Sequence, residues 1–486
     1  MEAEEKYDLI VIGTGTAGTT VAQTIRSKGW NVAIIDSLPF GGTCALRGCE
    51  PKKILVEAAK VVDAYARYRN KGIFIPEYLE IQWSNLIRFE KNFTEPFVIQ
   101  RENDYMKDGI HTYHGEAEFK GSNDIRIIRR SERNSDSEVE WESTIYGKKI
   151  VIATGTKPVD LMMKDSELIT TSDQFLAFEH KKLPNKIIFI GGGFISFEFA
   201  HIAARAGVRE ITIIHRGQSP LNHFDPVLVK LLLQKCKDVG INVIMNTTIE
   251  SIQKSKLEDR SKGILARLVN SNPETIDGKE KYQSQFISAD LIVHGAGRIA
   301  NIKNLNLEKG NVKSSSNGIL VNDFLQSVSN PDVYAAGDVV ASKNPNATPK
   351  AGFEGELVAS NLLSGNTVKA KYDEIPRVVF TIPALASVGK NEMELKKGGF
   401  NFRVNYQDTS NEYTSKRICE TCSGFKVLID NETDKILGAH LIGPHAEEVI
   451  NIFSLAIKLG LTTSDLRNST LYSYPTRSSD IPYMLN

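Results

Sequence analysis

The sequence predicts an α/β protein of several domains, and two observations lead to this fold class. The chain has 486 residues, which is too long for one hydrophobic core and is typical of three or four domains. Two apolar segments, Asp8–Ile12 and Lys186–Ile190, each run into a glycine-rich turn and then into a stretch of helical composition. A buried strand followed by such a turn and a helix is typical of a Rossmann-like unit, so we expect two of them.

The first of these units has every feature of a dinucleotide-binding site. Its turn carries Gly13, Gly15 and Gly18, and the next apolar strand, Val32–Ile35, ends at Asp36. The glycines let a pyrophosphate approach the backbone, and a carboxylate at the position of Asp36 accepts the ribose hydroxyls. The segment therefore predicts dinucleotide binding.

The second unit departs from this pattern at two places. Its turn carries Gly191 and Gly193, but Ser196 replaces the third glycine, and its second strand ends in His215-Arg216 where an NAD site would carry a carboxylate. Cations at this place suit a 2′-phosphate, which favours NADPH. The alternative is that Arg216 is an ordinary solvated surface arginine.

Charge and hydropathy exclude several classes of partner. Lys plus Arg equals Asp plus Glu at 59 each, so no bulk field attracts nucleic acid or an anionic membrane. The sequence contains no apolar run of about 18 residues, and its acidic start leads straight into the first strand. We expect a cytoplasmic protein whose partners are small molecules and a second copy of the chain.

Two of the five cysteines form a close pair. Cys44 and Cys49 stand in the segment GGTCALRGCEPKK, directly after the first dinucleotide unit. This combination indicates electron transfer from a flavin to the pair, with a low-pKa thiol at a helix N-terminus. The alternative is a pair of packed core thiols.

The other cysteines give weaker signals. Cys419 and Cys422 form a C-x-x-C that we interpret as packed or surface thiols, because no second Cys/His pair at zinc spacing accompanies them. Cys236 is predicted to be an ordinary helix residue. We expect no metal site.

Several further segments appear in the order that one family has them. The chain resembles the flavoprotein disulfide reductases, the class I family of glutathione reductase, dihydrolipoamide dehydrogenase and mercuric reductase, over nearly its whole length. Beyond the segments above, the matching elements are Ile150–Pro158 with its Ala-Thr-Gly, Gly295–Arg298, Val333–Asp338 followed by Thr348-Pro349, and Gly424–Pro444. The resemblance implies FAD as a cofactor, in addition to the NADPH that His215-Arg216 favour, and a homodimer whose active site both subunits share.

The resemblance also implies roles for single residues. Cys49 is expected against the isoalloxazine as the charge-transfer thiol, and Cys44 as the outer thiol that attacks substrate. Lys52 is expected beside flavin N5 with Glu198 as its partner, where a cation stabilises the charge that arrives with a hydride. The expected cofactor-binding residues are Gly13, Gly15, Gly18, Asp36, Gly42, Thr43, Thr154, Gly155, Arg298, Gly337 and Asp338 for FAD, and Gly191, Gly193, Phe194, His215 and Arg216 for NADPH.

One departure from the family concerns the substrate. Family members that act on dithiols or glutathione carry a His-Pro-Thr element with a glutamate five residues on, and here Tyr474 replaces the histidine and Ser479 the glutamate. A phenol with a pKa near 10 donates a proton but is a poor base at neutral pH. Mercuric reductase is similar in having tyrosine near this place, but it ends in a cysteine pair, whereas this sequence ends Tyr483–Asn486.

We expect an FAD-binding domain at 1–156, an NAD(P)-binding domain at 157–282, a return to the FAD-binding domain at 283–367 and an α+β dimerisation domain at 368–486. The predicted function is an oxidoreductase that passes electrons from NADPH through FAD to Cys44–Cys49 and on to a small oxidised substrate, other than a standard glutathione or lipoamide reductase. The alternatives are a flavin-mediated reductase of a metal ion, quinone or other acceptor, and a redox-sensing flavoprotein without turnover. The sequence leaves the acceptor open.

Overall fold

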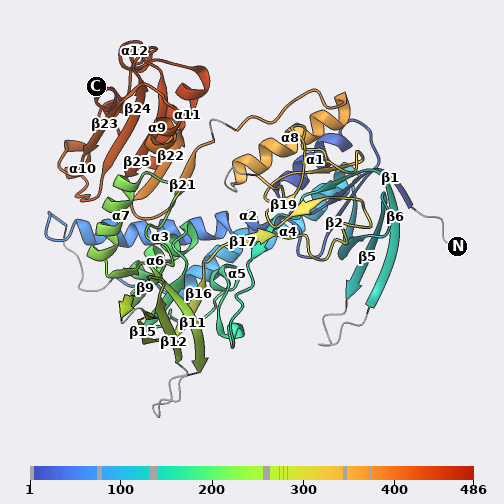
Figure 1. The fold of residues 1–486 in the computed structure, drawn as a ribbon, viewed down its shortest axis with the longest axis horizontal. Helices are drawn as coiled ribbons and strands as arrows, with labels where there is room; N and C mark the ends of the chain where they lie inside the picture. Colours follow the sequence, from blue (N-terminus) through green and yellow to red (C-terminus); the bar gives the residue numbers. More distant parts are fainter. Residues whose placement is uncertain are drawn as a thin grey trace. The chain divides into compact units, whose positions relative to one another are not determined.

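The chain forms two compact units that alternate along the sequence (Figure 1). The computed structural model describes residues 5–73, 79–130, 139–254, 263–272, 274–276, 279–281, 283–342, 347–372 and 375–486. The first unit comprises Met1–Lys52, Phe89–Val159 and Arg298–Tyr372, and the second comprises Lys53–Arg88, Asp160–Gly297 and Asp373–Asn486.

A seven-stranded sheet forms the centre of the first unit, in the order β3-β2-β1-β6-β5-β4, with β20 also paired to β6. Strands β3, β2, β1, β6 and β20 run parallel to one another, whereas β5 is antiparallel to both of its neighbours, β6 and β4. The strands are β1 (Glu5–Ile12), β2 (Val32–Asp36), β3 (His111–His114), β4 (Glu116–Phe119), β5 (Asp124–Arg130), β6 (Val139–Ile152) and β20 (Val333–Ala335). Short pairs lie outside this sheet, namely β7 (Thr156–Pro158) with β17 (Arg298–Ala300), and β18 (Ser314–Ser315) with β19 (Gly318–Ile319).

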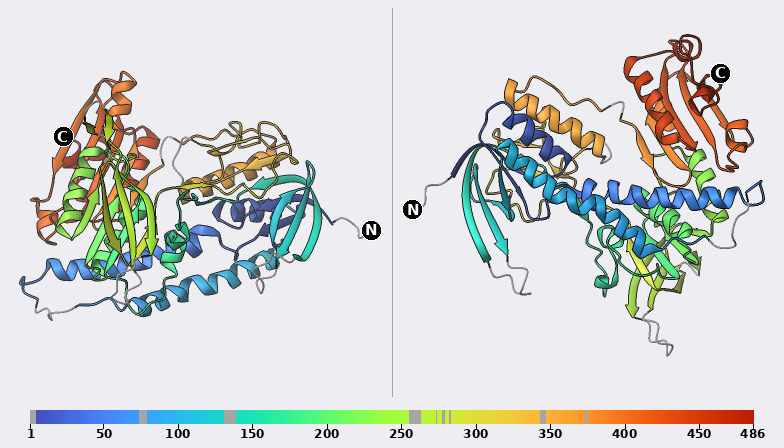
Figure 2. Two further views of the ribbon diagram at one scale, coloured as in Figure 1. Left: turned by 60° about the horizontal axis from the view of Figure 1, so that its bottom comes forward. Right: turned by 180° about the vertical axis from the view of Figure 1, so that it is seen from behind.

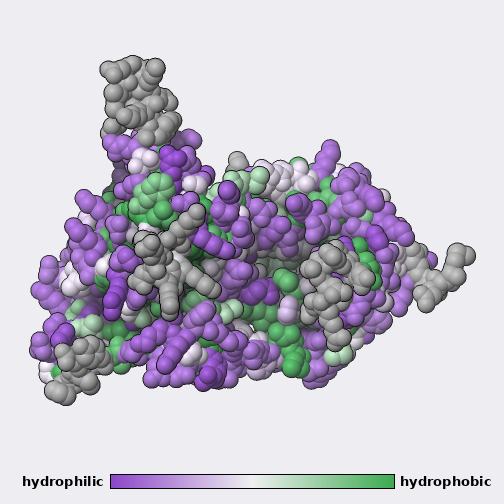
Figure 3. Space-filling model, turned by 90° about the horizontal axis from the view of Figure 1, so that it is seen from below, coloured by the Kyte–Doolittle hydropathy of each residue, from purple (hydrophilic) through white to green (hydrophobic). Residues whose placement is uncertain are grey.

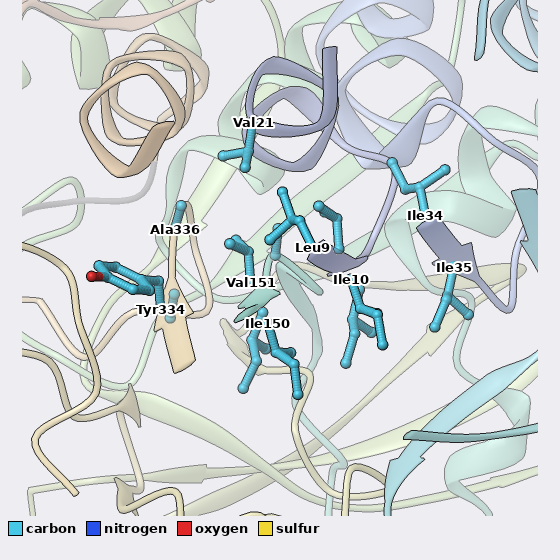
Figure 4. Close-up of a cluster of buried hydrophobic side chains, with 14 of the residues drawn as sticks. Leu9, Ile10, Val21, Ile34, Ile35, Ile150, Val151, Tyr334 and Ala336 are labelled. Atoms are coloured by element: carbon cyan, nitrogen blue, oxygen red, sulfur yellow. The ribbon is translucent and has the colours of Figure 1, made fainter. Parts of the chain in front are cut away.

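The parallel strands are apolar along their length because both faces of the sheet are covered. In Figure 4 the side chains of neighbouring strands follow one another in the order β2, β1, β6 and β20, with Leu9 and Ile10 of β1 between the strands that carry Ile34 and Ile150. All four of these side chains are fully buried. This core fixes the carboxyl ends of β1 and β2, where the first glycine turn begins.

Helices complete the first unit and connect it to the second. The helix after the first turn, α1 (Thr16–Arg26), packs along α8 (Thr348–Ser364), and Figure 2 shows the two side by side. The remaining helices of this part of the chain are α2 (Gly42–Arg47), α3 (Cys49–Arg67) and α4 (Trp83–Asp108).

The second unit contains the second predicted nucleotide-binding sheet, which is parallel and has the order β10-β9-β8-β16. Its strands are β8 (Lys186–Ile190), β9 (Glu210–Ile214), β10 (Ile241–Ile244) and β16 (Leu291–His294), and an antiparallel sheet beside it has β11 (Thr247–Lys254), β12 (Ile264–Asn270) and β15 (Ser284–Ala289). Strands β13 (Glu274–Ile276) and β14 (Lys279–Lys281) form a pair, and the helices are η1 (Ser166–Leu168), α5 (Ser172–Leu176), α6 (Phe194–Arg205) and α7 (Pro226–Asp238). Because β16 pairs with β8, this sheet continues past residue 282, where we expected the domain to end.

The C-terminal part of the second unit is an antiparallel sheet with the order β21-β22-β25-β24-β23. Helix α11 (Ala446–Leu459) packs on β22 and β25 and contributes the buried Val449, Ile450 and Phe453 to the core. The strands are β21 (Arg377–Val379), β22 (Ala384–Gly389), β23 (Phe402–Asp408), β24 (Gly424–Asp430) and β25 (Ile436–Gly443), and the other helices are α9 (Glu392–Lys397), α10 (Tyr413–Lys416), α12 (Thr463–Asn468), η2 (Ser478–Asp480) and α13 (Ile481–Met484).

Hydrophilic side chains predominate on the face shown in Figure 3, where hydrophobic side chains gather only in small separate groups. Among the residues that the structure describes, no helix has both the length and the apolar character needed to cross a bilayer.

Candidate active site

The first glycine turn is built so that only glycine fits at its key positions. Gly13 has a φ of 110°, and a Cβ there would lie 2.3 Å from the carbonyl oxygen of Ala153. A Cβ on Gly18 would lie 2.0 Å from the Gly13 oxygen. Gly42, with a φ of 73°, packs so closely that its Cβ would meet the Gly15 Cα at 2.4 Å. The start of α2, which carries Cys44, is thereby held against the turn.

Asp36 at the end of β2 is fixed by the turn that it faces. Its Oδ2 accepts hydrogen bonds from the Thr14 N–H at 2.9 Å and from the Thr14 hydroxyl at 2.6 Å, and its Oδ1 accepts one from the Leu38 N–H at 3.0 Å. The Thr14 hydroxyl oxygen in turn accepts from the Gly41 N–H at 3.1 Å. These bonds orient the carboxylate and leave its remaining lone pairs for ribose hydroxyls.

The two cysteines meet one threonine from a distant part of the chain. Cys44 lies on α2 and Cys49 is the first residue of α3, and both are thiols rather than a disulfide in this structure. Thr348, the first residue of α8, donates its hydroxyl hydrogen to Cys44 Sγ at 3.1 Å, and its oxygen lies 3.5 Å from Cys49 Sγ. Thr348 belongs to one of the matching sequence elements, but nothing in its spacing from the cysteines indicated this contact.

The electrostatics of Cys44 differ from our expectation of a low-pKa thiol. Its pKa is raised above the usual thiol value, chiefly because of its hydrogen bond with Cys49, and next because of its partial burial. The bond from Thr348 acts in the opposite direction and lowers the pKa. For Cys44, the adjacent thiol and desolvation therefore outweigh the hydrogen bond from Thr348.

Further residues around the first turn fit a flavin dinucleotide. The hydroxyl oxygen of Thr154 is buried and meets no hydrogen-bond partner among the described residues, so it is available to a ligand. Gly155 has a φ of 62°, and Arg298 donates to the Thr156 hydroxyl at 3.1 Å and to the Thr156 carbonyl at 2.8 Å. Together with the turn at Gly13 and the start of α1, these groups supply backbone and hydroxyl donors of the kind a pyrophosphate takes.

In the second turn, as in the first, a glycine with a positive φ lies close to neighbouring backbone. Gly191 has a φ of 103°, and a Cβ there would lie 2.4 Å from the Gly295 carbonyl oxygen. Ser196 fits in place of the third glycine because its hydroxyl points back to the Ile190 carbonyl at 3.4 Å and is fully buried. The helix and strand thus remain close without the third glycine, and Gly193 stands as the N-cap of α6.

His215 has a different role from the cationic one that we expected. The Gly192 N–H donates to its Nδ1 at 3.2 Å, and its Nε2 lies 2.9 Å from the Ser219 carbonyl oxygen, to which it donates. Both ring nitrogens are thus engaged within the turn. His215 therefore holds the turn, whereas the neighbouring Arg216 is exposed.

The other expected residues of the nicotinamide side lie on α6. Phe194, at its start, is 47% exposed. Glu198 is 1% exposed and its Oε1 accepts from the Phe380 N–H at 2.8 Å. Lys52 belongs to the first unit and Glu198 to the second, and their pairing stays a prediction.

The segment around Tyr474 is anchored to the C-terminal sheet while the tyrosine itself is 82% exposed. The Arg477 guanidinium donates to the hydroxyls of Ser423 at 2.5 Å and Thr409 at 3.2 Å, and to Asp480 Oδ2 at 3.1 Å. Ser479 donates to the Thr476 carbonyl at 2.6 Å, so it closes a local turn. The anchor presents Tyr474 to the outside of this subunit.

The remaining cysteines have structural surroundings. Cys236 is fully buried beside His201, whose Nε2 lies 3.3 Å from its sulfur, and burial raises the pKa of Cys236 to about 12. Cys422 is buried and donates to the Leu231 carbonyl at 3.6 Å, and burial raises its pKa as well. Among the described residues, no three His, Cys, Asp or Glu side chains gather as a metal site.

Comparison with known proteins agrees with this architecture. Residues 7–355 match the family model described as pyridine nucleotide-disulphide oxidoreductase, and residues 375–484 match the dimerisation domain of the same family, which supports a homodimer. The chain is 29% identical over 485 residues to a mercuric reductase of Lysinibacillus sphaericus, covering 98% of this chain and 82% of the relative. It is 49% identical over 181 residues to an uncharacterized 19.7 kDa protein in a mercuric resistance operon of Staphylococcus aureus, covering 37% of this chain and all of that protein.

The fold is also that of solved structures. The Cu(II) complex of the HOCl-induced flavoprotein disulfide reductase RclA from Escherichia coli superposes with a TM-score of 0.83 at 23% identity, covering 99% of both chains. This likeness confirms the predicted α/β architecture with its C-terminal dimerisation domain. The chain therefore belongs to the pyridine nucleotide-disulphide oxidoreductase family, as a class I flavoprotein disulfide reductase.

Proposed function

We propose that the protein passes electrons from NADPH through FAD to the Cys44–Cys49 pair and from there to a small oxidised substrate. The observation that carries this proposal is the contact of Thr348 with both sulfurs, at the start of α8 and in the same unit as the first glycine turn. Two thiols that share one hydroxyl partner lie close enough to be coupled electrostatically, as the raised pKa of Cys44 indicates.

Residues of the first unit would hold FAD. The turn from Gly13 to Gly18, Asp36, Thr154 and Asp338 supply the donors and the carboxylates for a dinucleotide. FAD, when bound, would supply two-electron transfer between the nicotinamide and the thiol pair. In the second unit, Gly191 and Gly193 would receive the pyrophosphate of NADPH, and Arg216 its 2′-phosphate.

The thiol pair would then reduce a disulfide-like substrate in two balanced displacements. The Cys44 thiolate attacks one substrate sulfur, the S–S bond breaks, and the first product leaves as a thiolate that takes up a proton. The Cys49 thiolate attacks Cys44 Sγ, which releases the second product and forms the Cys44–Cys49 bond. Two electrons have moved to the substrate, and two from NADPH restore the dithiol.

Tyr474 limits which substrates suit this chemistry. The dimerisation domain would bring Tyr474 of one subunit to Cys44 of the other, where a phenol lends a proton but does not accept one at neutral pH. Substrates with a good leaving group should therefore turn over faster than glutathione disulfide or lipoamide.

A second candidate function is metal-ion reduction, since a metal ion needs no proton on departure. The similarity to a mercuric reductase and to a protein in a mercuric resistance operon favours this alternative. Among the described residues, the thiols near Thr348 would be the first ligands for a soft metal ion, because thiolates bind such ions best.

The test is a rapid-mixing comparison of acceptors against the reduced enzyme. Glutathione disulfide, lipoamide, activated disulfides, Hg(II), Cu(II) and a quinone are each mixed with the wild type, with Tyr474→Phe and with Tyr474→His/Ser479→Glu. We expect poor turnover of glutathione disulfide by the wild type and a gain of about 10²–10⁴ in the double variant, which is the usual size of general acid–base help. Fast wild-type turnover of glutathione disulfide that Tyr474→Phe does not change would contradict this account of Tyr474.

A further inference from the structure

A buried pair of opposite charges lies on α8, two residues after Thr348. Lys350 and Glu354 are one helical turn apart, and both side chains are 0% exposed. The Lys350 Nζ lies 3.6 Å from Glu354 Oε1. Fully buried lysine and glutamate side chains are rare, because desolvation of either charge is costly.

Glu354 is tied to the turn that carries Asp338. The Gly337 N–H donates to Glu354 Oε2 at 2.6 Å, and the Tyr372 hydroxyl donates to Oε1 at 2.7 Å. Gly337 has a φ of 83°, so this turn has a backbone conformation that needs support. Burial raises the pKa of Glu354, whereas the lysine beside it and the donors on both of its oxygens oppose that change and favour the carboxylate form.

Lys350 has no role as a hydrogen-bond donor within the described part of the chain, since its Nζ meets no acceptor there. Its remaining contribution is its charge. Burial raises the pKa of Asp338, and the positive charges of Lys350 and Arg298 oppose that change. The charge of Lys350 thus acts on two carboxylates, the buried Glu354, which it contacts, and the partly buried Asp338.

We propose that Glu354 is the positioning residue of the Gly337–Asp338 turn in the FAD site, and that Lys350 is a fixed buried cation that balances Glu354 and biases the reduction potential of the bound FAD. This inference rests on the proposed function for the presence of FAD. Glu354 acts through the Gly337 backbone, and Lys350 acts through its charge.

The test measures the midpoint potential of bound FAD by spectroelectrochemistry. It uses a Cys44→Ser/Cys49→Ser background, so that the flavin is the redox centre that titrates. Glu354→Gln removes a negative charge and should raise the potential, because an added positive field favours electron-rich FAD. Lys350→Met should lower it, and the electrically balanced double variant should return close to the background value.

The matched control is an exposed pair in the same unit, Lys369 with Asp323, whose charged atoms lie 3.0 Å apart. Lys369→Met and Asp323→Asn should leave the potential unchanged. Shifts of Glu354→Gln and Lys350→Met in the same direction, or no shift in either, would overturn the charge role.

The positioning role has a readout that does not need the cofactor. In the apoprotein, the Gly337 amide should exchange its hydrogen at least about tenfold faster in Glu354→Ala than in the wild type, with Glu354→Gln in between because it keeps an acceptor. Exchange at Gly337 that Glu354→Ala does not change would overturn the positioning role. A protein with normal protection at Gly337 that takes up no FAD would instead contradict the proposed function.

Discussion

The two glycine turns have a similar backbone conformation, but they differ in the side chain that stands at the end of the second strand of each unit. In the first turn Asp36 accepts the Thr14 N–H at 2.9 Å, and in the second His215 accepts the Gly192 N–H at 3.2 Å. Both side chains therefore tie the end of the strand to the turn. A carboxylate has acceptor sites to spare for a ribose, whereas the histidine uses both of its nitrogens inside the turn.

In the first turn, Asp36 is expected both to support the turn and to bind the ribose. In the second turn we expect two different residues to share these tasks. In the second unit His215 holds the turn, and the exposed Arg216 is the residue that we propose for ligand selection. We therefore expect the two positions to affect catalysis in different ways, and the following variants test that division.

The largest effects should come from the glycines themselves. Gly13→Ala should reduce FAD content at least about tenfold, because a positive φ costs about 1–3 kcal/mol even before the clash with Ala153 is counted. Gly191→Ala should keep FAD, measured by absorbance per chain, but raise the NADPH KM by at least about tenfold.

The matched controls are Gly29→Ala and Gly207→Ala. Both glycines have a φ of 86°, and a Cβ would meet nothing within 4 Å at either. These variants should lose some stability but keep FAD and NADPH affinity. If Gly13→Ala retains its FAD, the first turn is not the FAD site.

Arg216→Ala should raise the NADPH KM by roughly 10- to 100-fold, since a charge-assisted contact is worth about 1.5–3 kcal/mol. The NADH KM should remain almost unchanged. Steady-state kinetics with NADPH and with NADH measures both KM values. An equal rise in the two KM values would show that Arg216 does not determine nucleotide specificity.

His215→Ala should weaken both nucleotides alike, by about 2- to 10-fold, because a hydrogen bond to the turn contributes about 0.5–1.5 kcal/mol. The ratio of the NADPH and NADH affinities from binding titrations should stay the same. A selective loss of NADPH would show that His215 contacts the 2′-phosphate after all.

The smallest effect concerns the thiols, which belong to the same unit as the first turn. The pKa of Cys44 is raised by Cys49 and by burial and lowered by Thr348, so Thr348→Val should raise it further. At a given pH less thiolate is then present, and the rise of alkylation rate with pH should move to higher pH. A profile that stays in place, or moves to lower pH, would contradict the role of Thr348; Thr348→Ser is the conservative control.

Local patterns predicted the parts of the site that follow one another in the chain. The order strand, glycine turn, helix and Asp36 is contiguous, so its periodicity and spacing were sufficient for the first turn. The contact of Thr348 with Cys44 spans about 300 residues and depends on the packing of α8 along α1, which no short pattern encodes. The same is true of Glu354, whose partner is a backbone N–H rather than a recognisable side chain.

Two expectations failed because the surroundings of a side chain decide its electrostatics. His215 was expected as a cation from its position beside Arg216, but the backbone of the turn uses both of its nitrogens. A low-pKa thiol was expected at a helix N-terminus, but the pKa of Cys44 is raised, chiefly by its hydrogen bond with Cys49. The pairing of Lys52 with Glu198 and the position of Tyr474 in the dimer remain predictions.

The most direct test of the central claim is an anaerobic titration with two electrons per FAD. We expect the wild type to develop long-wavelength absorbance from the Cys49 thiolate against oxidised flavin. Cys44→Ser should show this absorbance before any electrons are added, because its Cys49 has no disulfide partner, and Cys49→Ser should lack it. Bleaching of the flavin by the first two electrons in the wild type would show that the Cys44–Cys49 pair takes no electrons. Absorbance that persists in Cys49→Ser would show that the two sulfur roles are assigned the wrong way round.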